Sequence, residues 1–320
     1  MDTLSQLLSL SQTQVSLDVR CLLDGAFSIP HEIMCPGEAA FHFLLSGECQ
    51  LRLSKDLTLK MNAGDFVLLP HGSAHELLNV TKDTHSVRKI TRDIRIQAGK
   101  SLPIKCNQDA ANLADVDLLC GRFVFTRGAG TLLMQSLPQV LHVCLRDSSG
   151  VDQLEALISL LRTETDDAQP GAHSIVNTLG QVLLIFALRT YSQGTNISPN
   201  LLALAADRRL GPSIQAILES PAQPWTISSL GKMVAMSRAT YARQFQDRSG
   251  MTVGGFLTQI RIMRACELLS NTALGQADIG EAVGYQSEAA FGKAFHKIMG
   301  QTPGRWRRWR RWRRWQRMGS

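Results

Sequence analysis

Histidine and cysteine side chains are the groups in this sequence whose types and spacing could support metal or redox chemistry. One histidine belongs to a regular pattern, G-x5-P-x-G-x2-H-x3-N, which Gly64, Pro70, Gly72, His75 and Asn79 satisfy without a gap. Glycine and proline at such spacing punctuate short strands and turns. An imidazole presented by this framework is a candidate metal ligand.

The spacing is that of the second motif of cupin barrels, and the N-terminal region resembles that fold. Of the first cupin motif, Gly37, His42 and Gly47 are present, whereas its second His and its Glu ligand are missing. The family resemblance implies that a cupin enzyme needs three His and one carboxylate around its metal. His42 and His75 alone do not make that site, so we expect no catalysis. A metal-dependent cupin enzyme with an accessory helical domain is the alternative.

Seven cysteines, at positions 21, 35, 49, 106, 120, 144 and 266, form no CxxC pair and leave an odd thiol. This argues against a secreted disulfide framework and leaves free thiols, metal ligands or redox sensors. Cys21 and Cys120 are expected at strand edges flanking the barrel, where, with His42 and His75, they could give zinc two thiolates and two imidazoles. The alternative is that all four are packed, satisfied core side chains. We expect small buried apolar side chains at Cys35, Cys49, Cys144 and Cys266, and exposed turn positions at His31 and His71.

The periodicity of the chain changes from strand-like to helical. Residues 19 to about 127 hold short β-type runs and predict a small antiparallel barrel or sandwich, interrupted by an extended loop over 81–117 and resumed by a strand at 118–125. From about 137 the period is helical, at 151–162 and 174–189. The second of these helices is apolar on more than one face, which fits burial against the barrel, a homodimer interface, or both.

These patterns predict an α+β chain with four parts. They are a cupin-like sensor domain at 1–136, a helical connector and dimerisation segment at 137–200, an all-α domain with two helix-turn-helix motifs at 201–307, and a tail at 308–320. Linker composition at 192–200 marks the main boundary.

The all-α part contains a fifty-residue repeat. The matching pairs are Ser237 with Ser287, Tyr241 with Phe291, Phe245 with Phe295, Gly250 with Gly300, and Thr252 with Thr302. In each copy the serine can cap a helix, the aromatics share its buried face, and the glycine can end it. A short helix precedes each copy, at 228–234 and at 278–282. This arrangement predicts two helix-turn-helix motifs.

Residues 208–307 resemble the DNA-binding domain of AraC/XylS-type transcription regulators. The matching residues are Trp225, Thr226, Ile227, Leu230, Met236, Ser237, Arg238, Phe245, Arg261, Ala265, Leu268, Leu269, Ile279, Val283, Gly284, Tyr285, Ser287, Phe291, Phe295, Gly300, Thr302 and Pro303. The resemblance implies that recognition helices near 237–247 and 287–298 enter successive major grooves of bent double-stranded DNA. By family position, the base-facing side chains are Arg238, Ala239, Ala242 and Arg243 in the first helix and Glu288, Ala289, Gly292 and Lys293 in the second.

The two recognition helices differ in what they offer to bases. Arg243 can donate two hydrogen bonds to guanine, whereas the small residues of the second helix offer close approach and methyl contact. We therefore expect the first helix to dominate sequence discrimination. Gly231 and Gly280 stand where the family usually has Ala, and each is expected to cost about 1 kcal/mol of helix stability unless neighbouring packing absorbs it.

Among AraC/XylS-type regulators with cupin sensors, the N-terminal region is most similar to reactive-chlorine-sensing activators of enterobacteria. The matching residues are Met1, Asp2, Leu4, Leu7, Leu8, Cys21, His42, Leu68, Leu69, Pro70, Ser73, Ala74, His75, Cys120 and Gly121. The resemblance implies that Cys21 and Cys120 are a redox pair whose oxidation alters the hold of the sensor on the DNA-binding domain. The segment between His75 and Cys120 is longer than this similarity implies and contains Cys106, so another thiol is an alternative partner for Cys21.

The net charge of +7 is concentrated in the C-terminal tail. Residues 305–320 contain eight Arg and no acidic residue, so the other 304 residues carry one net negative charge, and global charge does not indicate DNA binding. In the tail, Trp306, Trp309, Trp312 and Trp315 recur every third residue, which gives no clean apolar helix face. We expect a dispensable extension; non-specific nucleic-acid binding and adhesion to anionic membrane are the alternatives.

The sequence contains neither an apolar run of about 18 residues nor a signal peptide, which predicts a cytoplasmic protein that needs no membrane. We predict a homodimeric, DNA-binding transcription activator that works with RNA polymerase and responds to a chemical signal at the cupin domain, with cysteine oxidation as that signal. A regulator that binds a small-molecule effector without redox sensing, and a ligand-binding module that acts through a partner protein, are alternatives.

Overall fold

The computed structural model describes residues 2–11, 13–79, 95–97, 101–107, 114–125, 129–147, 151–166, 169–194 and 198–308. Its internal packing divides the chain into two units. The barrel unit comprises Gln14–Val124 and Leu137–Gly194, and the helical unit comprises Met1–Thr13, Phe125–Ser136 and Thr195–Ser320. The α+β class predicted from the sequence is confirmed.

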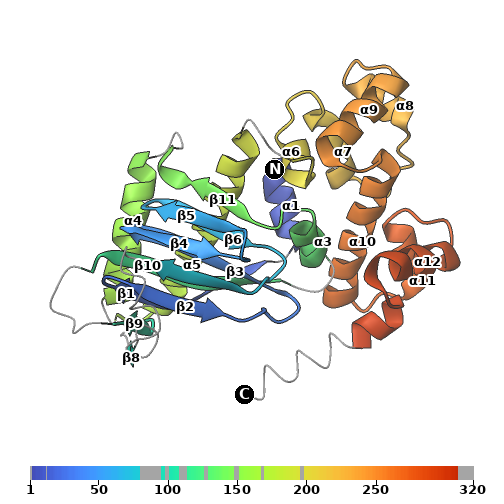
Figure 1. Ribbon diagram of the computed structural model, residues 1–320. Coiled ribbons are helices and arrows are strands. Elements are labelled where there is room, and N and C mark those ends of the chain that lie inside the picture. The colour runs from blue at the N-terminus through green and yellow to red at the C-terminus, as the bar shows by residue number, and fades with distance from the viewer. Residues whose placement is uncertain are drawn as a thin grey trace. The chain divides into compact units, whose positions relative to one another are not determined.

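The barrel unit consists of two facing sheets (Figure 1). Within the described residues, one sheet has the strand order β11-β6-β3-β10-β1-β9-β8 and the other the order β2-β7-β4-β5. The strands are β1 (Gln14–Leu23), β2 (Phe27–His31), β3 (Glu38–Ser46), β4 (Glu48–Arg52), β5 (Thr58–Asn62), β6 (Asp65–Leu69), β7 (His75–Asn79), β8 (Arg95–Gln97), β9 (Ile104–Cys106), β10 (Val116–Val124) and β11 (Leu141–Cys144). Strand β9 pairs in parallel with β1, so the described part of 81–117 is not a loop throughout; residues 80–94, 98–100 and 108–113 lie outside the described residues.

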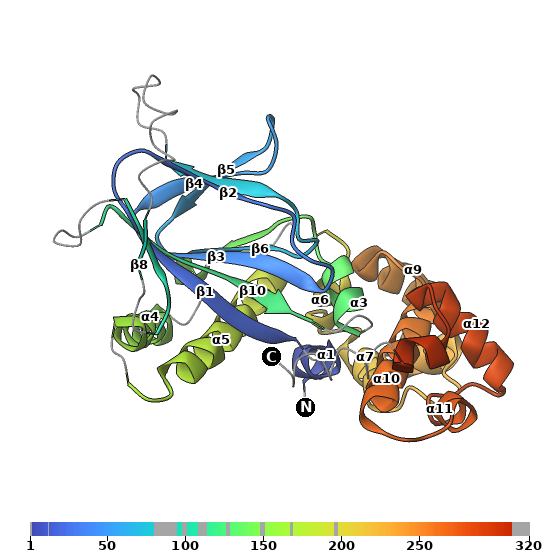
Figure 2. The ribbon, with the colours of Figure 1, turned by 90° about the horizontal axis from the view of Figure 1, so that it is seen from below.

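Two helices cover the outer face of the sheet that contains β1, β3 and β10, as Figure 2 shows: α4 (Val151–Asp166) and α5 (Ala172–Gln193). By length and composition, α5 is apolar enough to cross a membrane. It packs on β1 and β11, however, and at Gly180 an added Cβ would lie 2.6 Å from Val15 Cγ1. Such close approach is possible only because glycine has no side chain. The burial of α5 against the barrel, one of the two sequence-based interpretations, is therefore found.

The helical unit is built around the long helix α10 (Val253–Asn271), which contributes to two hydrophobic cores. Ile298 packs against both cores. The first motif, α8 (Ile227–Met233) and α9 (Arg238–Ser249), packs on its first half, and the second motif, α11 (Gln276–Ala282) and α12 (Glu288–Met299), on its second half. The remaining helices of the unit are α1 (Thr3–Ser11), α3 (Ala129–Gln135), α6 (Leu201–Ala205), α7 (Gly211–Glu219) and residues 303–308.

Two helices from the N-terminal part of the sequence belong to the helical unit. Leu7 of α1 and Leu133 of α3 are each 1% exposed and lie in the same core as Leu230 and Phe245 of the first motif. The packing therefore divides the chain differently from the expected boundary at residue 136, because α1 and α3 bury apolar side chains that their own short segments cannot cover.

Candidate nucleic-acid interface and barrel cluster

Both recognition helices have the termini that the sequence predicts. The Ser237 and Ser287 hydroxyls accept hydrogen bonds from the backbone N–H groups of Thr240 and Ala290, each at 3.2 Å. Gly250 and Gly300 close the helices at φ 73° and 68°, in the left-handed region that favours glycine. The paired aromatics of the repeat, Tyr241 and Phe245 in the first motif and Phe291 and Phe295 in the second, are fully buried.

The fifty-residue spacing does not hold throughout the repeat. Helices α9 and α12 are 50 residues apart, but α8 and α11 end 49 residues apart, so the second motif has one extra residue in its turn. Ala235 occupies the first turn at φ 53°, and Gly284 the second at φ 92°. The glycines inside the first helices mark close packing: a Cβ at Gly231 would lie 2.9 Å from the Met236 carbonyl oxygen, and one at Gly280 would lie 3.1 Å from Phe291 Cβ.

The side chains expected to face bases lie opposite these cores. Arg238, Ala239 and Arg243 are exposed and Ala242 is half-buried; in the second motif Glu288, Ala289 and Lys293 are exposed and Gly292 is half-buried. A side chain added at Gly292 would meet open space. The two helices thus present corresponding surfaces, of which the first carries two guanidinium groups and the second one ammonium and one carboxylate.

Other arginines of the helical unit have structural partners. Arg261 Nε donates to the Pro221 carbonyl at 2.8 Å, and its guanidinium lies 5.6 Å from the ring centre of Tyr285. Arg248 pairs with Asp207 at 3.0 Å. These contacts join α10 and α9 to neighbouring segments, which separates their role from that of Arg238 and Arg243.

The barrel cluster consists of Cys21, His31, His42, His75 and Cys120, which come together inside the barrel unit. Strand register places Cys120 of β10 opposite His42 of β3, and His31 of β2 opposite His75 of β7. Cys21 Sγ lies 3.9 Å from Cys120 Sγ. Cys21 and Cys120 lie within paired strands rather than at strand edges, and both are buried.

One arrangement of protons satisfies the ring contacts of the cluster. His75 Nδ1 lies 2.9 Å from the Ser73 carbonyl oxygen, so this nitrogen donates and His75 Nε2 must accept. The acceptor's partner is His42 Nε2, at 2.7 Å, which therefore carries a proton. His42 Nδ1 is then left with a lone pair, and it faces Cys120 Sγ at 3.1 Å. His42 Nδ1 can accordingly accept a hydrogen bond from the Cys120 thiol.

Burial favours the neutral forms of His31, His42, His75 and the Cys120 thiol. Burial, with the neighbouring charges of His75 and Lys105, lowers the pKa of His31 to about 4, and burial also lowers the pKa of His42 and of His75. The hydrogen-bonded contact with Cys21, together with burial, raises the pKa of the Cys120 thiol well above its ordinary value. A neutral imidazole whose lone pair is not already accepting a hydrogen bond can bind a metal ion.

Two parts of this region are not predicted by the sequence pattern. His31 is a half-buried strand residue stacked on His75, with ring centres 4.6 Å apart, so its assignment to an exposed turn was wrong. Arg20, which directly precedes Cys21, forms a buried ion pair with Asp117 at 2.9 Å and reaches Asp166 of α4 at 2.7 Å. No short sequence motif predicts either feature, because both depend on strand register.

Of the thiols expected to be buried apolar side chains, Cys49 and Cys266 are buried, Cys144 is half-buried and Cys35 is exposed. The expectation was therefore wrong for Cys35. His71 is exposed, as expected.

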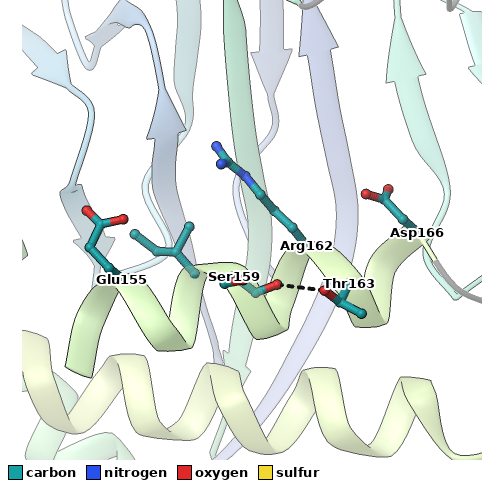
Figure 3. Close-up of a pocket in the computed structure, with 6 residues that line it drawn as sticks. Glu155, Ser159, Arg162, Thr163 and Asp166 are labelled. Carbon is teal, nitrogen blue, oxygen red and sulfur yellow. Dashed lines mark hydrogen bonds between the residues drawn. The ribbon is translucent and has the colours of Figure 1, made fainter. Parts of the chain in front are cut away.

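A shallow pocket of about 380 Å³ lies on α4 and is lined by Glu155, Ile158, Ser159, Arg162, Thr163 and Asp166 (Figure 3). Its charged groups already have protein partners: Arg162 pairs with Asp117 at 3.2 Å, and Asp166 with Arg20. This pocket is outside the cysteine and histidine cluster and has little apolar surface for an organic effector.

Comparison with known proteins identifies both parts of the chain. A family described as Cupin matches residues 2–193, and one described as Helix-turn-helix domain matches residues 230–309. An HTH-type transcriptional activator from Escherichia coli K12, RCS-specific RclR, is 30% identical over 96% of this chain and 97% of its own length. The chain belongs to the AraC family of transcription regulators. Its cupin domain and its DNA-binding class are thereby confirmed.

Two other AraC-type relatives have similar coverage. The HTH-type transcriptional regulator MtrA of Neisseria gonorrhoeae is 32% identical over 96% of this chain and 98% of its own length. An uncharacterized HTH-type transcriptional regulator of Haemophilus influenzae is 32% identical over 96% of this chain and 99% of its own length. The similarity therefore extends over both units.

Proposed function

We propose that this AraC-type regulator is a transcription activator whose binding to DNA depends on the oxidation state of the cysteines in the barrel cluster. The observation that carries the proposal is the contact of two buried thiols, Cys21 and Cys120, beside His42, whose Nδ1 can accept a hydrogen bond from Cys120. A two-electron oxidant such as a hypohalous acid or a peroxide would take two electrons from these thiols. A disulfide would form, the thiol protons would be released, and the oxidant would be reduced.

Disulfide formation would displace the two strands. Val19 lies opposite Cys120, and Cys21 lies opposite Leu118, so the cysteines are diagonal neighbours. Diagonal Cα atoms in antiparallel strands are about 7–8 Å apart, whereas disulfides usually join Cα atoms about 4.4–6.8 Å apart. Closing the bond therefore requires backbone movement, for which the irregularity between Leu17 and Val19 offers a weak point.

The displaced strands continue directly into the helical unit. α1 ends at Ser11 and β1 begins at Gln14, while β10 ends at Val124 and α3 begins at Ala129. Both helices contribute to the core of the first motif. Strand movement would thus change the packing beneath Arg238 and Arg243. The buried residues in the core of the second motif all lie between Ile262 and Trp306, so this core includes neither α1 nor α3.

The proposed function also includes partners, a location, an oligomeric state and a metal ion. We propose DNA as the partner of α9 and α12, RNA polymerase as the partner of the activator, a cytoplasmic location, and no catalytic activity. We propose a homodimer through α4 and α5, on which Leu160 and Ile175 are 43% and 39% exposed. Zinc is proposed as an ion for the barrel cluster.

The test uses the full chain and an operator selected from random DNA duplexes. Cys21→Ala and Cys120→Ala should each abolish the oxidant-induced change in transcription while leaving DNA binding intact, and Cys35→Ala, at an exposed thiol, is the matched control. An unchanged oxidant response in both variants would refute cysteine control. Failure to select any preferred duplex would refute sequence-specific DNA binding. If Cys106 were the true partner of Cys21, Cys106→Ala rather than Cys120→Ala would lose the response.

A further inference from the structure

Three side chains in the barrel unit bring potential metal-binding atoms together. His31, His42 and Cys120 each offer one such atom, and these atoms all lie within 4.8 Å of one another. His31 Nδ1 lies 3.2 Å from the Ile29 carbonyl oxygen, so it donates there and leaves Nε2 with the free lone pair. His42 has its free lone pair on Nδ1, the nitrogen that faces Cys120.

The distances suit a tetrahedral ion that takes nitrogen and sulfur ligands. Zinc–sulfur and zinc–nitrogen bonds of about 2.3 and 2.0 Å place sulfur and nitrogen ligands about 3.5 Å apart and two sulfurs about 3.8 Å apart. His42 Nδ1 and Cys120 Sγ are 3.1 Å apart, and Cys21 and Cys120 Sγ are 3.9 Å apart. Small movements of these side chains would accommodate an ion, and Cys21, which contacts Cys120, offers a fourth donor.

His75 is in the wrong place to share this ion. Its Nε2 faces His42 Nε2 at 2.7 Å, on the opposite side of the His42 ring from Cys120. Its other nitrogen bonds the Ser73 carbonyl. His75 therefore orients His42 and fixes which nitrogen carries the proton, the usual task of a residue behind a metal-binding histidine.

We propose that His31, His42 and Cys120, with Cys21 as fourth donor, bind a zinc-class cation, and that His75 is a positioning residue outside the ligand set. This replaces the set of Cys21, His42, His75 and Cys120 expected from the sequence. This zinc site lies at the same cysteines as the control site of the proposed function. The proposal rests on that function only for the link between zinc binding and transcription. Binding releases the two thiol protons to solvent, and one divalent ion with two thiolates and two neutral imidazoles carries no net charge, which suits a buried site.

Metal binding and oxidation would then exclude each other. Both sulfurs are used in bonds to the ion, and the disulfide needs both. Zinc is therefore expected to slow disulfide formation between Cys21 and Cys120 in the full chain, and oxidation is expected to release zinc.

The test measures zinc affinity of the reduced full chain against a chromophoric chelator, with no DNA or oxidant present. Wild type should bind one equivalent, and Co²⁺ in its place should give a thiolate charge-transfer band. His31→Gln should weaken binding by more than about 100-fold, beyond the range of outer positioning residues. His75→Gln, whose side-chain carbonyl can still accept from His42 Nε2, should change affinity about tenfold or less. His71→Gln, at an exposed site, is the matched control.

Any one of three results would overturn the proposal. Wild type would bind no zinc, His31→Gln would have the same zinc affinity as His71→Gln, or His75→Gln would lose as much zinc affinity as His31→Gln. Thermal unfolding of each zinc-free variant checks that the barrel unit remains folded. Because transcription is not measured, a failed redox response and a failed metal site are distinguished.

Discussion

The first and second helix-turn-helix motifs share their caps and buried aromatics but differ in what surrounds them. The core beneath the first motif includes Leu7 and Leu133, from helices that continue into β1 and β10. The core beneath the second motif includes Trp306 and side chains of α10, α11 and α12. The two copies of the motif therefore differ in which helices pack beneath them, and this packing, rather than sequence similarity, determines which copy a movement of β1 or β10 would reach.

The largest expected effect separates the two cores. Leu133→Ala and Leu269→Ala each remove a buried side chain, 1% and 3% exposed, and each should cost about 2–5 kcal/mol of stability. Hydrogen exchange should increase mainly in α8 and α9 for Leu133→Ala and mainly in α11 and α12 for Leu269→Ala. The same exchange pattern in both variants would show that the two cores are one cooperative structure.

The turns should respond in opposite directions to exchanging their residues. Gly284→Ala places a Cβ 2.6 Å from the Ala222 carbonyl oxygen at φ 92°, so we expect a loss of about 2 kcal/mol or more. Ala235→Gly removes left-handed strain worth about 1–2 kcal/mol against a glycine cost of about 0.5–1 kcal/mol, so stability should rise slightly. Urea unfolding of the two variants measures both. Equal losses would mean that the turns are equivalent.

Affinity for DNA should separate the motifs next. Arg243→Ala should cost about 1–3 kcal/mol on the selected operator and relax its sequence preference, because a bidentate contact to guanine is lost. Lys293→Ala should weaken selected and unrelated duplexes alike, as expected for a phosphate contact. Competition binding at a fixed salt concentration distinguishes the two. Greater loss of sequence preference in Lys293→Ala would reverse the proposed roles.

The smallest difference in stability between the motifs is expected at Gly231 of α8 and Gly280 of α11. Alanine should gain about 1 kcal/mol of helix propensity at either position. At Gly231 the new Cβ would lie 2.9 Å from a backbone oxygen, so the net effect should be destabilising. At Gly280 the nearest atom is Phe291 Cβ at 3.1 Å, and the gain and the cost should nearly cancel. Stabilisation by Gly231→Ala in urea unfolding would show that α8 moves freely away from α9.

Local signals in the sequence were sufficient for the repeat and the cupin region. Ser237 and Gly250 define a helix through contacts within a few residues, and such contacts can be read from spacing. The strand-and-turn pattern around His75 likewise depends on neighbouring residues. These predictions agree with the family matches over 2–193 and 230–309.

What the sequence could not predict depends on long-range register. His31 reaches the cluster because β2 pairs with β7, so that it lies opposite His75, 44 residues away. Leu7 and Leu133 reach the first motif from more than 90 residues away in sequence. The Trp and Arg pattern beyond residue 308 lies outside the described residues, and its role stays a prediction.

Control of the first motif by the barrel cluster is tested most directly by a footprint of the full-length protein on its selected operator before and after oxidation. Oxidation should change protection at the half of the site read by α9 and leave the half read by α12 unchanged, and Cys120→Ala should abolish the change. Equal change at both halves, or an identical change in Cys120→Ala, would contradict control of the first motif through the barrel cluster.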